Sequence, residues 1–489
     1  MKINLLLPLI FIYFITRLPF LRLSPVFYDS FEYVRITEKI DFFNLRDVLL
    51  SSHQPVHTFY FLLILLFKKL FFFWDSGTIP GSIPFVSGLF TVIIFFKILS
   101  EYISRKSAFF AALTLLFFPY FFMVNTNIFY ESPLLFLQIF SFYLLTLSFK
   151  KKSLSYLIGS GVSLGLSVSV FIGSLIIFPL YLLIVFLNKN GKPFFKMLIF
   201  YATAVFTPLL IDLLIYNSPV FIYEKFKSHA VDVTSASGGL PVFVLRALRN
   251  IFVQYSAILS WPGLILGLIA VIFLIKRRQI NYKPVIFLFF PAFVLSQYWH
   301  AGLYGRLILY IIFPVAYLLT LFYQTKLSRI LVLSMLMIFC AKFMLQQKLT
   351  PPIYRYFDLY SKNAAGHEAI ITSDYNRFLY ERINSNLFVI NGGGINPEKF
   401  RGFINENLEE GADIIIDSAA LSYPYFQYDG NSYHILSKNR RGIPFVNKIM
   451  EQYETKIWAQ DTTSRDIYFL KLTIPSMADR IKKLKSAYD

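Results

Sequence analysis

The dominant feature of the sequence is a series of apolar runs, most of them about 15 to 20 residues long, separated by short clusters of Lys and Arg. A helix of about 20 apolar residues crosses a bilayer core, and it satisfies its backbone hydrogen bonds within its own segment. Of the 489 residues, 56% are hydrophobic and only 15% are charged, whereas soluble domains have about 25% charged residues. The sequence therefore predicts an α-helical polytopic membrane protein and excludes a disordered chain.

The apolar runs predict about eleven transmembrane helices. The first run, residues 3–23, has no small-residue cleavage site, so we expect an uncleaved anchor whose Arg17 snorkels to the far headgroups. The run at residues 56–67 is interrupted by Lys68 and Lys69 and is too short to cross, so we place it along the membrane surface. The other expected spans lie near residues 85–99, 108–124, 133–149, 154–169, 171–187, 194–216, 255–275, 284–298, 307–323 and 330–345.

The basic clusters predict the orientation of these spans. With residues 56–67 left out of the count, the clusters at 104–106, 150–152, 189–192, 276–278 and 326–329 fall on the same side as Lys2. The positive-inside rule then makes the N-terminus cytoplasmic in a plasma (inner) membrane. Because the formal charge of +19 resides in these separate clusters, it indicates membrane topology and no nucleic-acid partner. The single cysteine, Cys340, excludes an intramolecular disulfide.

Three segments are then expected on the outer face: a long first loop at residues 24–84, a loop at 217–254 and a tail at 346–489. In the tail, strand-like runs at 369–372, 387–390 and 413–416 alternate with helix-like stretches at 375–383 and 397–410. We therefore expect a transmembrane domain at residues 1–345 that carries the chemistry. Residues 346–489 are expected to form a soluble, extracytoplasmic α/β domain.

The first outer loop contains the sharpest candidate site. If Asp29 begins a helix, Glu32 and Tyr33 lie one turn further on, near the same face. A carboxylate beside the membrane, screened by apolar neighbours, gains basicity and can accept a proton from an attacking hydroxyl. The structural alternative is that Asp29 is only an N-cap and that Glu32 pairs with Arg35.

The second outer turn provides another acid. Glu131 opens a span, where the positive end of the helix favours a carboxylate. It is either a helix-start acid or a second carboxylate that faces the first across a cavity. His53 and His57 have the spacing of two metal ligands on a helix, but Pro55 between them argues against a continuous helix.

Cationic residues on the same face are candidates for contacting a phosphate. Arg306 can form a forked pair of hydrogen bonds with a phosphate, or it can lie at the headgroup level. His300 shares its loop, and the loop residues Lys225, Lys227 and His229 are similar candidates with solvated surface as the alternative. The run Gly392–Gly394 follows a strand, but it lacks the spacing of a nucleotide fingerprint and indicates a flexible turn.

In their order and topology these motifs resemble the polyprenyl-phosphate-sugar-dependent glycosyltransferases of the GT-C membrane fold, nearest to the protein O-mannosyltransferase and aminoarabinose transferase group. The likeness covers about residues 1–345 and comprises the first span, the acid motif at Asp29, the His-x-Pro turn at His53 and the acid turn at Glu131. Ser30 stands where the commoner pattern has Glu. The Trp-Trp-Asp signature of oligosaccharyltransferases is absent from the sequence, which disfavours N-glycan transfer.

The resemblance implies transfer of a sugar, with inversion, from a polyprenyl-phosphate donor to a hydroxyl of a lipid, glycan or protein acceptor on the outer face. It implies that Asp29 is the general base and that Glu32 and Glu131 are supporting acids. The reaction requires no nucleotide. Whether a divalent cation between Asp29 and Glu131 stabilises the leaving phosphate is left open. The candidate substrate-binding residues are Tyr33, His53, Lys225, His300 and Arg306.

Two rival classes remain open at this point. One is a lipid-linked glycan ligase or polymerase, and the other is a lipid or sugar transporter, since acids and broken helices in membranes also mark transport paths. Against a transporter, the acids cluster in one outer loop instead of at the midplane, and the sequence shows no pair of inverted halves.

Overall fold

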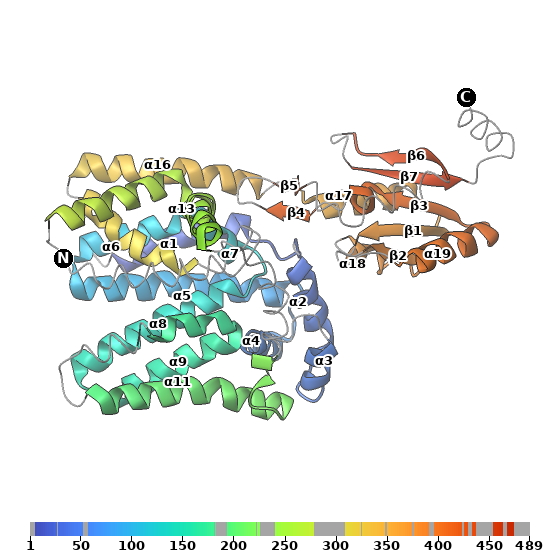
Figure 1. Ribbon diagram of the computed structural model, residues 1–489. Coiled ribbons are helices and arrows are strands. Elements are labelled where there is room, and N and C mark those ends of the chain that lie inside the picture. Colours follow the sequence, from blue (N-terminus) through green and yellow to red (C-terminus); the bar gives the residue numbers. More distant parts are fainter. Residues whose placement is uncertain are drawn as a thin grey trace. The chain divides into compact units, whose positions relative to one another are not determined.

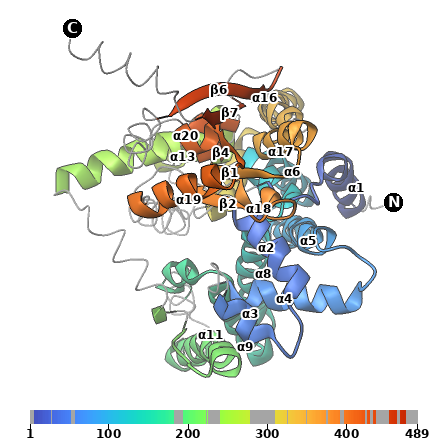
Figure 2. The ribbon, with the colours of Figure 1, turned by 90° about the vertical axis from the view of Figure 1, so that its right-hand side faces the viewer.

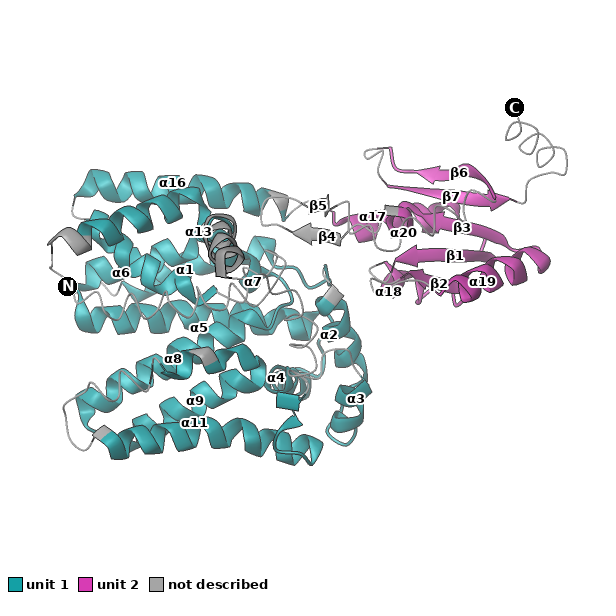
Figure 3. Cartoon of the chain, in the orientation of Figure 1, with its two compact units in different colours: residues 1–347 teal, residues 348–489 magenta. Residues whose placement is uncertain are grey.

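The computed structural model divides into two compact units, Met1–Gln347 and Lys348–Asp489, which we call the membrane unit and the α/β unit (Figure 3). The structure describes residues 5–26, 28–51, 57–179, 181, 193–221, 223–224, 240–277, 309–323, 325–347, 350–373, 376–390, 396–422, 425–428, 433–436, 453–462 and 467–473.

The membrane unit is helical throughout its described elements (Figure 1). Five helices are long and apolar enough to cross a bilayer, and a sixth span is present if the pair α6 and α7, bent by 69°, is one crossing. The chain is therefore an integral membrane protein. The five spans belong to α5 (Thr78–Tyr102), α8 (Glu131–Lys151), α11 (Pro193–Tyr216), α13 (Leu240–Arg277) and α16 (Lys326–Gln346), and the bent pair is α6 (Arg105–Leu116) with α7 (Pro119–Thr126). In α13, which is kinked at Ser260, the candidate span is Tyr255–Phe273.

Other expected spans are shorter helices, so the count of eleven stays a prediction. Three apolar stretches have only 10 to 17 helical residues, and the expected run at 171–187 begins as the 3₁₀ helix η2 (Ile172–Ile177). The run at 284–298 lies outside the described residues. The shorter elements are α1 (Leu6–Arg17) with η1 (Leu18–Phe20), α9 (Leu154–Val170), and α15 (Ile312–Leu318) with η4 (Leu319–Phe322).

Arg17 corrects one expectation, because it is fully buried and does not snorkel. Its guanidinium donates a hydrogen bond to the carbonyl oxygen of Leu116, the last residue of α6. It also lies over the rings of Tyr13 and Phe122, 5.4 Å from each centroid. The last carbonyls of a helix have no intrahelical donor. The break between α6 and α7 therefore creates an acceptor inside the bundle, and Arg17 satisfies it.

Three short helices lie at one end of the bundle: α2 (Tyr28–Lys39), α3 (Leu45–Ser51) and α4 (Thr58–Leu70). Figure 2 looks onto this end. Helix α4 continues through the two lysines that interrupt its apolar run. Lys68 Nζ lies 2.7 Å from the carbonyl oxygen of Thr37 and 2.8 Å from that of Ile40, where α2 ends. Lys69 pairs with Asp41 at 2.9 Å. The lysines thus join α4 to the negative end of α2.

The α/β unit is built on a five-stranded sheet in the order β2-β1-β3-β7-β6. Strands β1 (Glu368–Ser373), β2 (Leu387–Ile390) and β3 (Asp413–Asp417) are parallel and lie where the sequence predicts them. Strands β6 (Glu454–Gln460) and β7 (Tyr468–Thr473) extend the sheet in antiparallel fashion and were not expected. A separate pair is formed by β4 (Tyr425–Tyr428) and β5 (Tyr433–Leu436).

Helix α19 (Pro397–Glu409) follows its sequence signals closely. The side chain of Asn396 accepts hydrogen bonds from the backbone nitrogens of Glu398 and Lys399, and Gly411 has a φ of +74° just past the end. The other helices are α17 (Pro352–Asn363), α18 (Arg377–Tyr380) and α20 (Ser418–Ser422). Helix α18 is shorter than the expected stretch at 375–383.

Candidate active site

Asp29 lies in the first turn of α2 and is partly buried. The helix begins at Tyr28, so Asp29 is inside the helix and is not the N-cap residue of the structural alternative. The turn before the helix is held by Ser30, whose Oγ accepts a hydrogen bond of 2.9 Å from the backbone nitrogen of Val26. The carboxylate of Asp29 therefore lies at the positive end of α2, and the hydrogen bond between Val26 and Ser30 fixes the start of that helix.

Glu32 forms the ion pair that the structural alternative predicts. Its Oε2 accepts hydrogen bonds from Arg35, at 2.7 Å from Nη2 and 3.1 Å from Nε. Glu32 is fully buried, whereas the side chain of Arg35 is 38% exposed. A forked pair between a buried carboxylate and a guanidinium fixes both side chains. Because both residues belong to α2, the pair stabilises the first turns of that helix.

Tyr33, one turn beyond Asp29, connects α2 to the rest of the bundle. Its ring contacts Tyr60 of α4 at 5.1 Å and His57 at 6.2 Å between centroids. His57 stacks on Tyr130 at 3.8 Å, and its Nδ1 lies 2.7 Å from the carbonyl oxygen of Val170. A carbonyl only accepts, so Nδ1 carries the hydrogen. The stack therefore links the starts of α4 and α8 to the end of α9.

Glu131 is the first residue of α8 and is fully buried, directly after the stacked Tyr130. The next residue, Ser132, lies with its hydroxyl 2.7 Å from both the carbonyl oxygen of Pro84 and Oδ1 of Asn125. Burial raises the pKa of Tyr60 well above its usual value, and the charge of Glu131 adds to that rise. Glu131 is thus a buried acid within electrostatic reach of the aromatic group that contacts α2.

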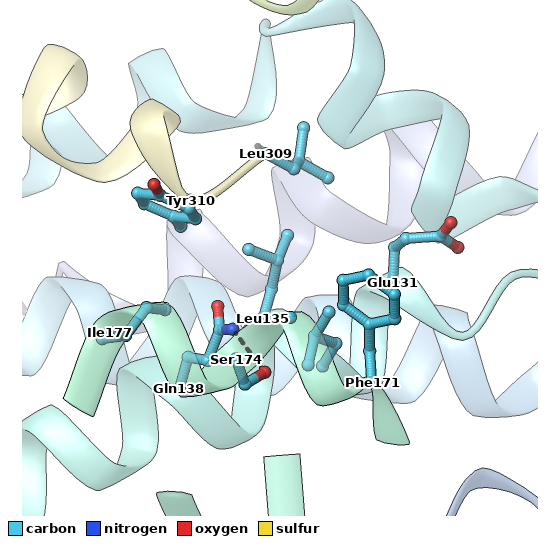
Figure 4. Close-up of a pocket in the computed structure, with 10 residues that line it drawn as sticks. Glu131, Leu135, Gln138, Phe171, Ser174, Ile177, Leu309 and Tyr310 are labelled. Carbon is cyan, nitrogen blue, oxygen red and sulfur yellow. Dashed lines mark hydrogen bonds between the residues drawn. The ribbon is translucent and has the colours of Figure 1, made fainter. Parts of the chain in front are cut away.

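A pocket begins at Glu131 and follows one face of α8 (Figure 4). Residues 131, 134, 135 and 138 share this face because residues three, four and seven apart align on a helix. The pocket is lined by Glu131, Leu134, Leu135, Gln138, Phe171, Gly173, Ser174, Ile177, Leu309 and Tyr310.

The structure brings together part of the predicted site. Asp29 and Tyr33 are four residues apart on one face of α2. Ring contacts lead from Tyr33 through His57 to Tyr130, the residue directly before Glu131. Asp29 is not among the residues that line the pocket. The candidates His53, Lys225, His300 and Arg306, with Gly392–Gly394, lie outside the described residues. Within the described ranges, no group of three or more His, Cys, Asp or Glu side chains gathers as metal ligands do.

Three residues of the site were missed by sequence reasoning or given another role. The sequence suggests His57 only as a metal ligand with His53, whereas in the structure it joins α4, α8 and α9. Gln138 lies on the same helix face as Glu131, as the spacing of seven residues predicts. Tyr310 comes from a distant segment, and no local signal connects it to α8.

Comparisons with known proteins point to one fold. The family described as dolichyl-phosphate-mannose-protein mannosyltransferase matches residues 53–216, while no curated protein matches the chain. The structure of ArnT from Cupriavidus metallidurans bound to undecaprenyl phosphate superposes with a TM-score of 0.56, at 9% identity over 97% of this chain and 99% of that one. The chain has the GT-C fold.

A second GT-C structure is similar over almost the whole chain. It is the oligosaccharyltransferase AglB from Archaeoglobus fulgidus, in complex with an inhibitory peptide and a dolichol-phosphate, with a TM-score of 0.53 and 12% identity over 97% of this chain and 74% of that one. The resemblance to GT-C transferases of the mannosyltransferase and aminoarabinose transferase type is therefore confirmed. The likeness to AglB concerns the fold, and the sequence lacks the Trp-Trp-Asp signature.

Proposed function

We propose that this GT-C protein is an integral-membrane glycosyltransferase that moves a sugar from a polyprenyl-phosphate donor to an acceptor hydroxyl at the outer face of the membrane. The observation that carries the proposal is the placement of Asp29. It lies in the first turn of α2, at one end of the bundle and one turn before Tyr33. Ring contacts lead from Tyr33 through His57 to Tyr130, the residue before the buried Glu131. In this proposal the base lies at the depth of a lipid headgroup.

In the proposed reaction Asp29 accepts the proton of the acceptor hydroxyl. The hydroxyl oxygen attacks the anomeric carbon as the bond between that carbon and the phosphate oxygen breaks. The bonding electrons leave with the polyprenyl phosphate, and attack from the opposite side inverts the anomeric configuration. Negative charge develops on the departing phosphate, so a cationic group lowers the barrier. Arg306, His300 and Lys225 are proposed for this role from the sequence.

Glu32 and Glu131 take different roles in the proposal. Glu32, paired with Arg35 one turn on, is proposed to stabilise the helical turn that carries Asp29. Glu131 borders the pocket and is proposed to contact the donor. The acceptor is a lipid, glycan or protein hydroxyl, and the proposed location is the inner membrane with a cytoplasmic N-terminus and an extracytoplasmic α/β unit. The solved GT-C relatives bind undecaprenyl phosphate or dolichol-phosphate, which supports a lipid-phosphate carrier.

The test is sugar transfer in proteoliposomes supplied with polyprenyl-phosphate sugars, measured as release of free polyprenyl phosphate together with a new glycosidic bond. Asp29→Asn should lower the rate about a hundredfold or more, the usual contribution of a positioned general base. Asp47→Asn is the matched control, because Asp47 is an exposed acid in the first turn of the neighbouring α3. Near-normal transfer by a stably inserted Asp29→Asn protein would reject the proposal. Movement of intact donor across the bilayer without bond formation would identify a transporter.

A further inference from the structure

Two exposed aromatic tips lie on the short helices at the end of the bundle that Figure 2 shows. The first tip is Phe42 and Phe43, between α2 and α3, and the second is Phe72 and Phe73, directly after α4. We call these four residues the aromatic tips. Their side chains are between 70% and 96% exposed. A contiguous exposed apolar patch marks a site that a membrane or another molecule covers.

An ion pair brings the two tips together. Asp41, which directly precedes the first tip, pairs at 2.9 Å with Lys69, three residues before the second. The first tip belongs to a closed turn. The side chain of Asn44 accepts a hydrogen bond of 2.6 Å from the backbone nitrogen of Asp41 and donates one of 2.9 Å to the carbonyl oxygen of Lys39. The backbone of the first tip is therefore held near the second tip, and its rings stay outside the packed interior.

The second tip precedes a membrane span, which sets its depth. Helix α5 begins at Thr78, and its 25 residues extend about 37 Å at 1.5 Å per residue, more than the roughly 30 Å of a hydrocarbon core. The start of α5 therefore lies at a headgroup layer. Asp75 closes the turn before it, because its Oδ1 accepts hydrogen bonds from the backbone nitrogens of Gly77 and Thr78. Only this short turn separates Phe73 from the span.

The aromatic neighbours of the second tip suit this depth. Trp74 stacks on Phe71 with 4.3 Å between ring centroids, and it contacts Phe73 edge-on at 6.1 Å. Tryptophan is enriched at membrane–water interfaces, where its ring lies at the headgroup level. With the indole at that level, the phenylalanine rings beside it are within reach of the acyl chains.

We propose that the aromatic tips insert their rings into the lipid leaflet at this end of the bundle and so anchor the first loop to the membrane. Lipid is the occupant because the second tip is continuous with the start of a span. Residues 38–75 contain four acidic and four basic residues, so their formal charge is zero. Removal of the rings from water therefore drives insertion, and anionic headgroups are not required. The inference goes beyond sugar transfer and does not depend on it.

The experiment measures the depth of a nitroxide attached to one cysteine at a time. The full chain, with Cys340→Ala, is reconstituted in phosphatidylcholine vesicles. Phe43→Cys and Phe72→Cys report on the two tips. Phe90→Cys, at an exposed position of the span α5, is the lipid reference. Ile457→Cys is the matched control, because Ile457 is an exposed large apolar residue on β6 of the α/β unit. Power saturation of the EPR signal compares collisions with oxygen, which concentrates in lipid, and with a water-soluble nickel chelate.

We expect the labels at Phe43 and Phe72 to collide with oxygen more than with the chelate. Their ratio of collision rates should shift from the value at Ile457 towards the value at Phe90. A ratio at either tip equal to that at Ile457 would show that this tip lies in water. Low collision rates with both reagents would show that protein covers the tips, as in a dimer formed through this face. Either result overturns the inference and leaves the proposed function untouched.

Discussion

The buried carboxyl of Asp417 should make the stability of the α/β unit depend on pH. Asp417 ends β3 and is fully buried, and burial raises its pKa from 3.8 to about 6. Its Oδ1 accepts a 2.7 Å hydrogen bond from the backbone nitrogen of Ala420, and its Oδ2 accepts from Thr372 and, at 3.0 Å, from Asn376. These bonds lower the pKa but do not cancel the effect of burial.

The sign follows from linkage between proton binding and folding. A folded-state pKa above the unfolded value means that the folded unit binds the proton more tightly. The stabilisation is fully present below pH 3.8 and is lost as the pH rises through 6. A shift of about 2 pKa units corresponds to roughly 3 kcal/mol, and about 2 to 3 kcal/mol of this should disappear between pH 4 and pH 7.

Asp417→Asn isolates this contribution because it keeps the shape and removes the charge. The Oδ1 of Asn376 makes no hydrogen bond in the described part of the chain, so a flip of that amide lets it accept from the new Asn side chain. The free energy of unfolding of the variant, taken relative to that of the wild type, should therefore rise by about 2 to 3 kcal/mol from pH 4 to pH 7. The assay is denaturant unfolding of the full chain, followed by the fluorescence of Trp458, with Trp74, Trp261 and Trp299 replaced by Phe. A difference between variant and wild type that stays constant with pH would refute the reasoning.

Two further predictions concern the membrane unit. Arg17→Met should destabilise the protein by about 1 to 3 kcal/mol, because the carbonyl oxygen of Leu116 loses its buried donor. The loss should appear as a lower Tm in detergent. An unchanged Tm would show that this hydrogen bond contributes nothing to stability. Gly165→Ala should also lower the Tm, because the new methyl carbon would lie 2.7 Å from the backbone oxygen of Ala204 and force α9 from α11, at a cost of about 1 to 3 kcal/mol. Gly159→Ala on the same helix meets only a flexible side chain at 3.3 Å and should be tolerated, so equal losses at both glycines would contradict the packing argument.

The sequence predicts best those features that arise from local physical signals. Apolar runs give the membrane class, and the strands of the α/β unit follow from their apolar residues and flanking turns. Asn396 and Gly411 mark the two ends of α19 because capping is decided within a few residues. The i,i+3 spacing likewise predicts that Glu32 can pair with Arg35. The spacing alone does not decide between this pair and a role for Glu32 as a supporting acid.

Features that depend on distant contacts could not be predicted. The buried state of Arg17 requires the carbonyl of Leu116, 99 residues away, and that acceptor exists only because the helix breaks before Pro119. The role of His57 depends in the same way on Val170. The break in residues 108–124 also divides a stretch whose composition indicates one continuous span.

The central claim is that the first loop and its Asp29 meet the lipid carrier at the outer face. Labelling of intact cells with a membrane-impermeant maleimide tests it directly. The native Cys340 is fully buried, which keeps the background low. We predict that Asp47→Cys in the first loop reacts without permeabilisation, whereas Lys151→Cys, at the opposite end of α8 from Glu131, reacts only after permeabilisation. The reverse pattern would place Asp29 in the cytoplasm and contradict the account.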